Sequence, residues 1–289
     1  MKQITRDLIS TLYKPTKEDA HKGTKGHALL VGGSYGKMGS ILLSSKAALR
    51  TGCGLVTAFV PECGVSILQT AFPEAMAIAD DNQKAISSIT FDFEPSAIGI
   101  GPGMGTEETT EEAFGEFLKS VKGPLVIDAD ALNILSGKRE WLKRVPSTTI
   151  LTPHPKEFDR LTKTHDTIEA RQKSAVAFAS EHKVIVVLKG APTIITNGTE
   201  TFENTTGNAA LATAGSGDVL TGIITSLLAQ GYQPLEAAQL GVYLHGLTAD
   251  IAVSHTGTES FIASDIIGLL GKAFLRIKEY TGKPIGFRN

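Results

Sequence analysis

Residues 204–228 read NTTGNAALATAGSGDVLTGIITSLL, a segment with two glycine-centred turns, a single acid and a long apolar run. The run after Asp218 predicts a buried helix, so Gly215, Ser216 and Gly217 lie just before its first turn. A helix N-terminus presents unpaired N–H groups and the positive end of the helix dipole, which suit an anion such as phosphate. Asp218 is therefore either a capping residue of this helix or a reactive carboxylate beside a bound anion.

Short apolar segments alternate with helix-like segments through most of the sequence. Their nearly continuous apolar character is typical of strands that are buried on both faces of a parallel sheet. Helix-like segments, for example residues 40–52 and 112–121, lie between them, and this alternation predicts an α/β fold with a mainly parallel central sheet. The six predicted strands are HALLVGG (27–33), GLVTAFV (54–60), SAIGIG (96–101), GPLVIDA (123–129), TTILTP (148–153) and KVIVVLKG (183–190).

The pattern changes in the last third of the chain. Residues 192–204 predict a β-hairpin with Asn197–Gly198 as its turn, because this dipeptide favours the tight turn of a hairpin. Since no linker or internal repeat interrupts the sequence, we expect one domain over residues 1–289, with its first strand at about residue 27. Three apolar helices are predicted after the hairpin, at about residues 217–230, 234–254 and 263–280.

Composition and charge exclude several classes of function. The chain of 289 residues is 42% hydrophobic and has a formal net charge of −2, so it lacks the basic excess of a nucleic-acid-binding protein. Its two cysteines, Cys53 and Cys63, form no metal-binding motif and no disulfide framework. The N-terminal segment lacks the apolar core of a signal peptide, and no apolar run is long enough to span a membrane. We expect a soluble cytoplasmic protein.

Glycines and polar side chains follow the predicted strands, in the segments GGSYGKMG, GPGMG, DADALN, PHPKEF and KGAPT. Because ligands of open α/β sheets bind beyond the carboxyl ends of the strands, a site is expected at this edge. GPGMG (101–105) lacks the GxGxxG spacing of a dinucleotide-binding turn, but Gly103 can allow a ligand close to the backbone. In DADALN, alternation along the strand predicts that only one of Asp128 and Asp130 faces the site.

Four further features have both a functional and an unremarkable interpretation. His154 lies between two prolines and is either a rigidly held ligand contact or an ordinary loop histidine. Glu157, three residues on, can hold Mg²⁺ through water. Lys189 ends a buried strand, where it either reaches solvent or contacts a nucleotide. The segment HKGTKGH (21–27) is either a solvated loop or an attractor of phosphorylated ligands.

The segments HKGTKG, GIGPGMG, DADALN, LTPHPKEF, VLKG, NTTGN and AGSGDVLTG occur in an order that resembles the ADP- or ATP-dependent NAD(P)H-hydrate dehydratases of the ribokinase-like superfamily. The resemblance runs from about residue 8 to about residue 275. It implies a three-layer α/β/α fold. It also implies a repair reaction in which the S epimer of hydrated NADH or NADPH (NADHX or NADPHX) loses water. The expected co-substrate is ADP, which gives AMP and phosphate, or else ATP, and the expected cofactor is Mg²⁺.

The resemblance also implies roles for individual residues. Asp218 corresponds to the base that activates the substrate hydroxyl, and Gly215, Ser216 and Gly217 to the anion hole. Ser40, where relatives often carry alanine, corresponds with Gly103, His154 and Asp218 to the contacts with the hydrated nicotinamide. Glu157 corresponds to a metal-binding acid, although His154 replaces the Asn of the superfamily's Asn-x-x-Glu motif. The implied nucleotide-binding positions are Lys189, Gly190, Ala191, Pro192, Thr193 and Gly217.

The resemblance also bears on the partners of the protein and on alternative functions. Many relatives carry an epimerase domain that this length does not accommodate, so the expected epimerase is a separate protein. The apolar segment 234–254, which includes LGVYLHGL, permits helix-mediated assembly, and the resemblance implies a homo-oligomer with a homotetramer as the expected form. One alternative is a kinase of the same superfamily that phosphorylates a vitamin-precursor alcohol, and the PHPKEF segment argues against it. The other is a non-catalytic nucleotide sensor, against which the intact GSGD turn argues.

Overall fold

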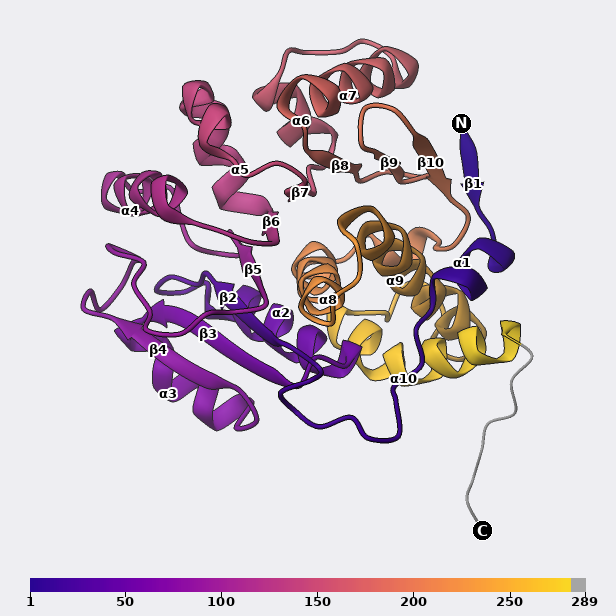
Figure 1. Ribbon diagram of the computed structural model, residues 1–289, viewed down its shortest axis with the longest axis horizontal. Coiled ribbons are helices and arrows are strands. Elements are labelled where there is room, and N and C mark those ends of the chain that lie inside the picture. Colours follow the sequence, from indigo (N-terminus) through magenta and orange to yellow (C-terminus); the bar gives the residue numbers. More distant parts are fainter. Residues whose placement is uncertain (282–289) are drawn as a thin grey trace.

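The computed structural model describes residues 1–281, apart from the side chain of Ser254, and contains a ten-stranded sheet (Figure 1). Its strand order is β1-β10-β9-β8-β7-β6-β5-β2-β3-β4. The seven strands from β8 to β4 in this order are parallel to one another, whereas β9 is antiparallel to both β8 and β10. The strands are β1 (Lys2–Ile4), β2 (His27–Val31), β3 (Leu55–Pro61), β4 (Met76–Asp80), β5 (Ala97–Ile100), β6 (Leu125–Ile127), β7 (Ile150–Leu151), β8 (Ile185–Leu188), β9 (Ile194–Thr196) and β10 (Thr201–Asn204).

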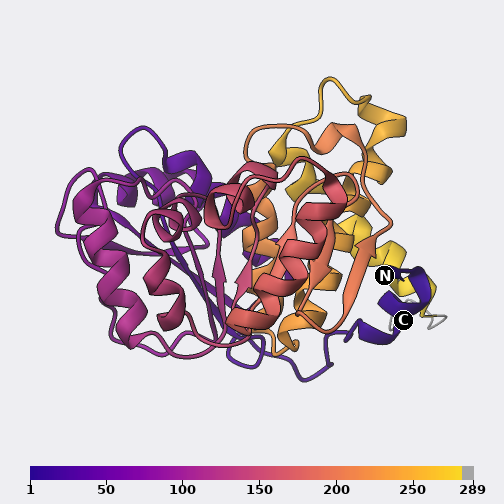
Figure 2. The ribbon, with the colours of Figure 1, turned by 90° about the horizontal axis from the view of Figure 1, so that it is seen from above.

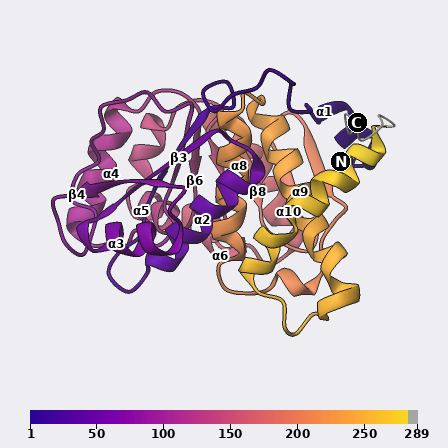
Figure 3. The ribbon, with the colours of Figure 1, turned by 90° about the horizontal axis from the view of Figure 1, so that it is seen from below.

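Helices cover both faces of the sheet, which confirms the predicted three-layer α/β/α architecture. The face formed by α4, α5, α6 and α7 is seen in Figure 2, and that formed by α2, α3, α8, α9 and α10 in Figure 3. The α-helices are α1 (Arg6–Leu12), α2 (Met38–Thr51), α3 (Glu62–Ala71), α4 (Glu108–Ser120), α5 (Ala129–Gly137), α6 (Pro155–Leu161), α7 (Ile168–His182), α8 (Ser216–Ala229), α9 (Pro234–Thr256) and α10 (Ala263–Tyr280). Two short 3-10 helices, η1 (Arg139–Arg144) and η2 (Ala209–Leu211), complete the order.

Each central strand has one side chain row in each of two hydrophobic cores. In β2, Ala28 and Leu30 pack with α2 and α8, whereas Leu29 and Val31 pack on the opposite face. All four side chains are fully buried. This double burial is the reason why the strands lack a polar alternation in the sequence.

The six predicted strands and the hairpin are present, but two short edge strands were missed. The expectation that the first strand begins near residue 27 is wrong, because β1 pairs in parallel with β10 at one edge. At the other edge, β4 is partly exposed, so it lacks the continuous apolar pattern of a central strand. The hairpin turn forms as expected, with Gly198 at a φ of 89° and the Asn197 side chain accepting bonds from the next backbone N–H groups.

The apolar segment of α9 is used inside the chain. Leu240, Tyr243 and Leu244 are buried against the chain's own core, whereas Val253 near the end of the helix is 41% exposed, so most of this apolar segment packs inside the chain. No helix within residues 1–281 combines the length and apolar character needed to cross a membrane. Cys53 is buried, Cys63 is partly exposed, and the two are not bonded to each other.

Close packing of α2 against α8 makes Gly222 a sensitive position. A Cβ atom at Gly222 would lie 2.1 Å from the backbone oxygen of Ser44, so Gly222→Ala must push the two helices apart. We expect this change to lower the free energy of unfolding by about 3 kcal/mol, measured by urea denaturation. The matched control is Gly268→Ala in α10, where an added Cβ meets nothing within 4 Å; it should gain up to ~1 kcal/mol. Equal stability of the two variants would contradict the assigned packing.

Candidate active site

The polar segments that follow β2, β5, β6, β7 and β8 converge at one edge of the sheet, because these strands are parallel. The first turn of α8 lies against this edge. A Cβ atom on Gly217 would lie 3.4 Å from the Nζ atom of Lys189 and 3.8 Å from a carboxylate oxygen of Asp128. Three segments far apart in the sequence are thus brought together.

The N-cap residue of α8 is Gly215, which has a left-handed conformation with a φ of 83°. Asp218 is the third residue of the helix, and no side chain caps this N-terminus. The capping interpretation of Asp218 is therefore wrong. The N–H group of Gly217 lies in the first turn, where helix geometry provides no intrahelical acceptor, whereas the N–H of Ser216 already donates to the oxygen of Thr213 at 3.3 Å.

Asp218 lies in surroundings that favour its protonated form. Burial raises the pKa of Asp218 to about 6, and repulsion by Asp128 acts in the same direction. A hydrogen bond from Ser40 and the positive charge of Lys189 oppose this rise in pKa. The Ser44 hydroxyl donates to the backbone oxygen of Asp218 at 2.9 Å and joins α2 to this turn. The carboxylate is consequently a base of useful strength near neutral pH.

This pKa gives a pH prediction. As the pH falls through about 6, Asp218 takes up a proton and can no longer accept one from a hydroxyl group. We expect the turnover of an Asp218-dependent reaction to fall about tenfold between about pH 8 and about pH 5. Stopped assays across this range would measure it, and urea denaturation at each pH would show that the protein stays folded. A flat profile would exclude Asp218 as the titrating base.

Lys189 is held in place by two buried carboxylates. Its Nζ atom lies 2.9 Å from Asp128 Oδ1 and 3.8 Å from Glu157 Oε2. Burial pulls the pKa of Lys189 down, but attraction to these two carboxylates outweighs it and holds the pKa above its ordinary value. The other oxygen of Asp128 accepts a bond from the Thr221 hydroxyl at 2.7 Å. The lysine is 21% exposed, so its charge remains available at the surface of the site.

Asp128 and Asp130 both belong to the site, contrary to the expectation that one of them faces away. Asp128 is the N-cap residue of α5 and Asp130 lies in the first turn, so strand alternation does not apply to them. Ala129 between them has a φ of 51°. Asp130 accepts a bond from the N–H of Gly105 at 2.9 Å and lies 3.9 Å from Lys37.

His154 and Glu157 form a reciprocal cap at the start of α6. The N–H of His154 donates to Glu157 Oε2 at 2.7 Å, and the N–H of Glu157 donates to His154 Nδ1 at 3.2 Å. Burial raises the pKa of Glu157, although the charge of Lys189 acts against this. Burial, with the positive charge of Lys189, lowers the pKa of His154. The imidazole is therefore neutral near pH 7 and is still partly exposed.

Magnesium has no preformed cage in the described part of the chain. Among residues 1–281, no group of three or more His, Cys, Asp and Glu side chains is placed to hold a metal ion. Glu157 is occupied by its cap and faces Lys189, which does not fit direct coordination of a cation.

The segment after β5 approaches the start of α2. A Cβ atom on Gly103 would lie 2.8 Å from the oxygen of Lys37 and 3.0 Å from Cβ of Ser40, so only glycine fits between these loops. Its own φ of 64° also favours glycine. The Ser34 hydroxyl donates to the oxygen of Gly103 at 2.8 Å. Gly103 and Ser40 are thus adjacent, as their predicted common role requires.

The segment from Lys189 to Thr193 forms a compact turn beyond β8. The N–H of Lys189 donates to the oxygen of Pro153 at 2.9 Å, which ties this turn to the loop that carries His154. The Thr193 hydroxyl donates to the oxygen of Gly190 at 3.0 Å. The Ala191–Pro192 peptide is cis. The segment HKGTKGH, in contrast, leads into β2 and so lies at the amino ends of the parallel strands, opposite the carboxyl ends where the site lies.

Two residues of α9 that the sequence analysis did not single out contact turns near the site: His245 contacts the first turn of α8, and Asp250 contacts the Gly207–Asn208 turn. His245 is buried, and its Nε2 atom lies 3.0 Å from the oxygen of Ser216 and 3.1 Å from its hydroxyl. Burial lowers the pKa of His245 to about 4, so it is neutral. Asp250 accepts bonds from the N–H of Gly207 and the side chain of Asn208. No local pattern distinguishes these two side chains from others on an apolar helix.

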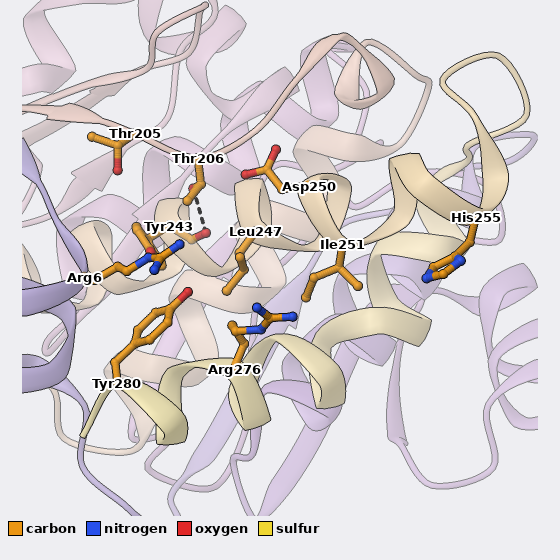
Figure 4. Close-up of a pocket in the computed structure, with 10 residues that line it drawn as sticks. All are labelled: Arg6, Thr205, Thr206, Tyr243, Leu247, Asp250, Ile251, His255, Arg276 and Tyr280. Carbon is orange, nitrogen blue, oxygen red and sulfur yellow. Dashed lines mark hydrogen bonds between the residues drawn. The ribbon is translucent and has the colours of Figure 1, made fainter. Parts of the chain in front are cut away.

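Asp250 also lines a hollow of about 430 Å³, which lies between the N-terminal segment, α9 and α10 (Figure 4). Arg6, Tyr243 and Tyr280 gather at one end of this hollow, where the Arg6 guanidinium lies 5.2 Å from the centre of the Tyr280 ring. The hollow thus adjoins the Gly207–Asn208 turn, and none of its lining residues belongs to the segments that follow β2, β5, β6, β7 and β8.

Comparison with known proteins gives consistent matches. The family described as NAD(P)H-hydrate dehydratase matches residues 28–270. The ADP-dependent (S)-NAD(P)H-hydrate dehydratase of Bacillus subtilis is 33% identical over 278 residues, with 95% of this chain and 98% of that protein covered. The enzyme of the same name from Neisseria meningitidis is 41% identical over 253 residues, with 85% and 83% covered.

The bifunctional NAD(P)H-hydrate repair enzyme Nnr of Moorella thermoacetica is 39% identical over 278 residues, which cover 92% of this chain and 52% of that protein. This chain therefore spans about half the length of the bifunctional relatives that it matches. Among solved structures, the ADP/ATP-dependent NAD(P)H-hydrate dehydratase of B. subtilis co-crystallised with ATP/Mg²⁺ has a TM-score of 0.85 at 30% identity, with 96% of this chain and 98% of that chain covered. A hydroxyethylthiazole kinase from Pyrococcus horikoshii shares the fold, with a TM-score of 0.60 at 15% identity over 87% of this chain and 89% of that chain.

Proposed function

The chain belongs to the NAD(P)H-hydrate dehydratase family, and on this basis we propose that it dehydrates the S epimer of NADHX and NADPHX while converting ADP to AMP and phosphate. The observation that carries the proposal is the placement of Asp218. Asp218 lies in the first turn of α8, beside the glycine turn. Burial raises the pKa of its carboxylate to about 6, and the positive charge of Lys189 acts on the same carboxylate. This is the arrangement that phosphorylation of a hydroxyl group needs.

In the proposed first step, the substrate hydroxyl loses its proton to Asp218, and its oxygen attacks the terminal phosphorus of ADP. An O–P bond forms, the bond to the AMP oxygen breaks, and AMP leaves. In the second step, the lone pair of the ring nitrogen expels phosphate, and the neighbouring ring carbon then loses a proton. The reduced nicotinamide is restored. Phosphorylation is necessary because hydroxide is a poor leaving group and phosphate is a good one.

Positive charge and backbone N–H groups stabilise the transferred phosphoryl group in this proposal. The first-turn N–H of Gly217 and the flexible turn at Gly215 provide donors, and Lys189 provides a fixed charge held by Asp128. The turn from Lys189 to Thr193 would contact the nucleotide. Ser216 holds the shape of this turn in the proposal, because its N–H donates to the oxygen of Thr213 and its hydroxyl lies 3.1 Å from His245 Nε2.

The hydrated nicotinamide is proposed to lie against Ser40, Gly103 and His154. Ser40 donates a hydrogen bond to Asp218, so it orients the base as well as contacting the ring. The absence of a side chain at Gly103 lets its backbone lie directly against Ser40, so both residues can contact the same ligand. The neutral His154 can offer a hydrogen bond without adding charge.

Magnesium is proposed to arrive with the nucleotide, because Mg²⁺ keeps several waters and binds phosphate oxygens more readily than all-protein cages. Glu157 would meet it only through water, since the carboxylate is already engaged in the α6 cap. Bound to the phosphates, the ion would neutralise their negative charge. In this proposal the proton of the substrate hydroxyl goes to Asp218, and the proton of the ring carbon goes to the released phosphate.

The proposal also covers the domain organisation, the location and the partners of the protein. We propose a single domain that acts in the cytoplasm, with an NAD(P)H-hydrate epimerase supplying the S epimer from a separate protein. We also propose assembly as a homo-oligomer, with a homotetramer as the expected form. Gel filtration with light scattering measures this assembly directly.

The decisive assay follows the near-ultraviolet absorbance of reduced nicotinamide when the protein meets chemically prepared NADHX with Mg²⁺ and either ADP or ATP. We expect a rise that depends on the nucleotide and that is faster with ADP. Folded protein that gives no rise with either nucleotide would contradict the proposal. Phosphorylation of hydroxyethylthiazole or hydroxymethylpyrimidine in its place would favour the kinase alternative.

A further inference from the structure

A hollow of about 310 Å³ lies beyond the carboxyl ends of β2, β3 and β4, at the same edge as the catalytic turn. We call it the β2–β4 pocket. The loops after β2 and β4 and the first turn of α3 line it, and none of its side chains takes part in the proposed chemical steps. The lining residues are Tyr35, Glu62, Cys63, Gln83 and Lys84.

Backbone hydrogen bonds fix the walls of the β2–β4 pocket. The N–H of Tyr35 donates to the oxygen of Lys84 at 2.8 Å, and the N–H of Cys63 donates to the oxygen of Gln83 at 3.2 Å. The carboxylate of Asp80 accepts several bonds from the loop that follows it. The loops are therefore preorganised before any ligand binds.

Tyr35 is the most unusual side chain of this pocket. It is 70% exposed, although its backbone is held firmly. The Nζ atom of Lys84 lies 5.5 Å from the centre of its ring. An exposed aromatic ring beside a cation is suited to a planar base that is linked to phosphate, because bases stack on aromatic rings and phosphates attract lysine.

The pocket is connected to the proposed nicotinamide site by one short segment. Tyr35 and Ser40 are five residues apart, which is at most about 18 Å of extended chain. The segment also turns, since the N–H of Lys37 donates to the oxygen of Ser34 at 2.8 Å. An extended dinucleotide can therefore reach from Ser40 to Tyr35.

The strand order gives the direction in which the substrate extends. The proposed nucleotide turn follows β8, Asp128 follows β6, and Ser40 follows β2, so the ADP lies on the β8 side of the catalytic turn. The second half of a dinucleotide substrate must avoid this side. The free side leads across β2 and β3 to β4, two steps of about 4.8 Å each, which is where the pocket lies.

We propose that the β2–β4 pocket binds the adenosine half of the dinucleotide substrate, with Tyr35 stacked on the adenine and Lys84 close to its phosphates. This inference rests on the proposed function and names the part of the substrate that the pocket recognises. The pocket makes the enzyme selective for intact dinucleotides over hydrated nicotinamide mononucleotide. It contributes to substrate binding and not to the chemical step.

The kinetic test compares Tyr35→Ala with wild type on two substrates. With NADHX, we expect the KM of Tyr35→Ala to rise about tenfold, with little change in kcat and none in the KM for ADP. With hydrated reduced nicotinamide mononucleotide, which lacks adenosine, the two proteins should be equal. Tyr35→Phe should behave as wild type. Lys84→Gln should also raise the KM for NADHX, whereas the exposed Lys272→Gln in α10 should not.

A second test needs no turnover. Cys63 lines the pocket and is partly exposed, whereas Cys53 is buried with a pKa raised by burial to about 11, so alkylation selects Cys63. NADH should slow the alkylation of Cys63, measured by mass spectrometry, and reduced nicotinamide mononucleotide should not. Equal protection by both, or by neither, would overturn the inference.

The two proposals can fail separately. Wild-type protein that dehydrates neither substrate contradicts the proposed function, and the alkylation experiment still decides whether the pocket binds adenosine. Active protein in which Tyr35→Ala has an unchanged KM for NADHX contradicts the pocket assignment and leaves the dehydratase intact.

Discussion

The Asp218→Asn variant is expected to bind nucleotide as wild type does and to lose about a thousandfold in kcat with NADHX. Asparagine has nearly the same shape as aspartate but cannot accept the proton of the substrate hydroxyl. The backbone N–H groups of the α8 turn, which are proposed to bind the phosphates, are unchanged. Single-turnover kinetics measures the chemical step, and calorimetry with ADP measures binding. Retention of more than about a tenth of the wild-type kcat would exclude Asp218 as the general base.

The same variant should be more stable than wild type at neutral pH. Burial raises the pKa of Asp218 to about 6, so the folded state binds its proton more tightly than the unfolded state does. Ionisation above about pH 6 therefore costs stability, and the neutral asparagine avoids this cost. We expect a gain of about 1–2 kcal/mol at about pH 8. The gain should vanish as the pH falls below the ordinary pKa of an aspartate.

Asp265 provides a matched control in another helix. It occupies the same third position in the first turn of α10, and its carboxylate accepts a bond from the N–H of Ile262 at 2.9 Å. Asp265→Asn should keep full activity and lose a little stability, since it weakens a cap. If Asp218→Asn behaved in this way instead, its role would be capping and not catalysis.

The Lys189→Met variant is expected to lose about 3–5 kcal/mol of stability together with nucleotide binding. It removes the cation that lies between Asp128 and Glu157, whose side chains are 1% and 8% exposed. Two buried carboxylates then repel each other with no charge to offset them. Urea denaturation measures the first effect, and calorimetry with ADP at a temperature where the variant is folded measures the second.

Two controls separate the loss of stability from the loss of binding. The double variant Lys189→Met/Asp128→Asn removes both charges of the closest pair, so it should regain part of the stability while still binding ADP poorly. Lys2→Met breaks the exposed pair with Glu200, which should matter by less than about 1 kcal/mol. A Lys189→Met variant as stable as Lys2→Met would contradict the buried ion cluster described here.

Much of the fold was predictable because its signals are local. The six central strands have continuous apolar sequences, since each is covered on both faces, and their lengths are set by the turns that follow them. The hairpin at Asn197–Gly198 and the glycine turn at Gly215 depend on backbone conformations that few residues other than glycine adopt readily. β1 and β4 were not predicted because β1 has only 3 residues and β4, although it has 5, is a partly exposed edge strand without a continuous apolar pattern.

The position of the site was also predictable, but its internal contacts were not. Parallel strands place their following loops at one edge, so the sequence indicated where Gly103, His154, Lys189 and Asp218 would gather. Their partners are distant in the chain: Lys189 pairs with Asp128, 61 residues away, and Ser216 contacts His245, 29 residues away. Strand alternation predicted that only one of Asp128 and Asp130 faces the site, but these residues occupy the N-cap position and the first turn of α5, where alternation does not apply.

The amino-acid sequence by itself determined the six central strands, the hairpin that follows them, the glycine turn before α8 and the family to which the chain belongs. The tertiary structure alone decided the protonation behaviour of Asp218, the charge balance around Lys189 and the lining of the β2–β4 pocket. The physical reason is the range of the interactions. Backbone conformation and the apolar pattern of a segment depend on residues that are close in the sequence, whereas the pKa of a side chain depends on burial and charges that only folding brings together.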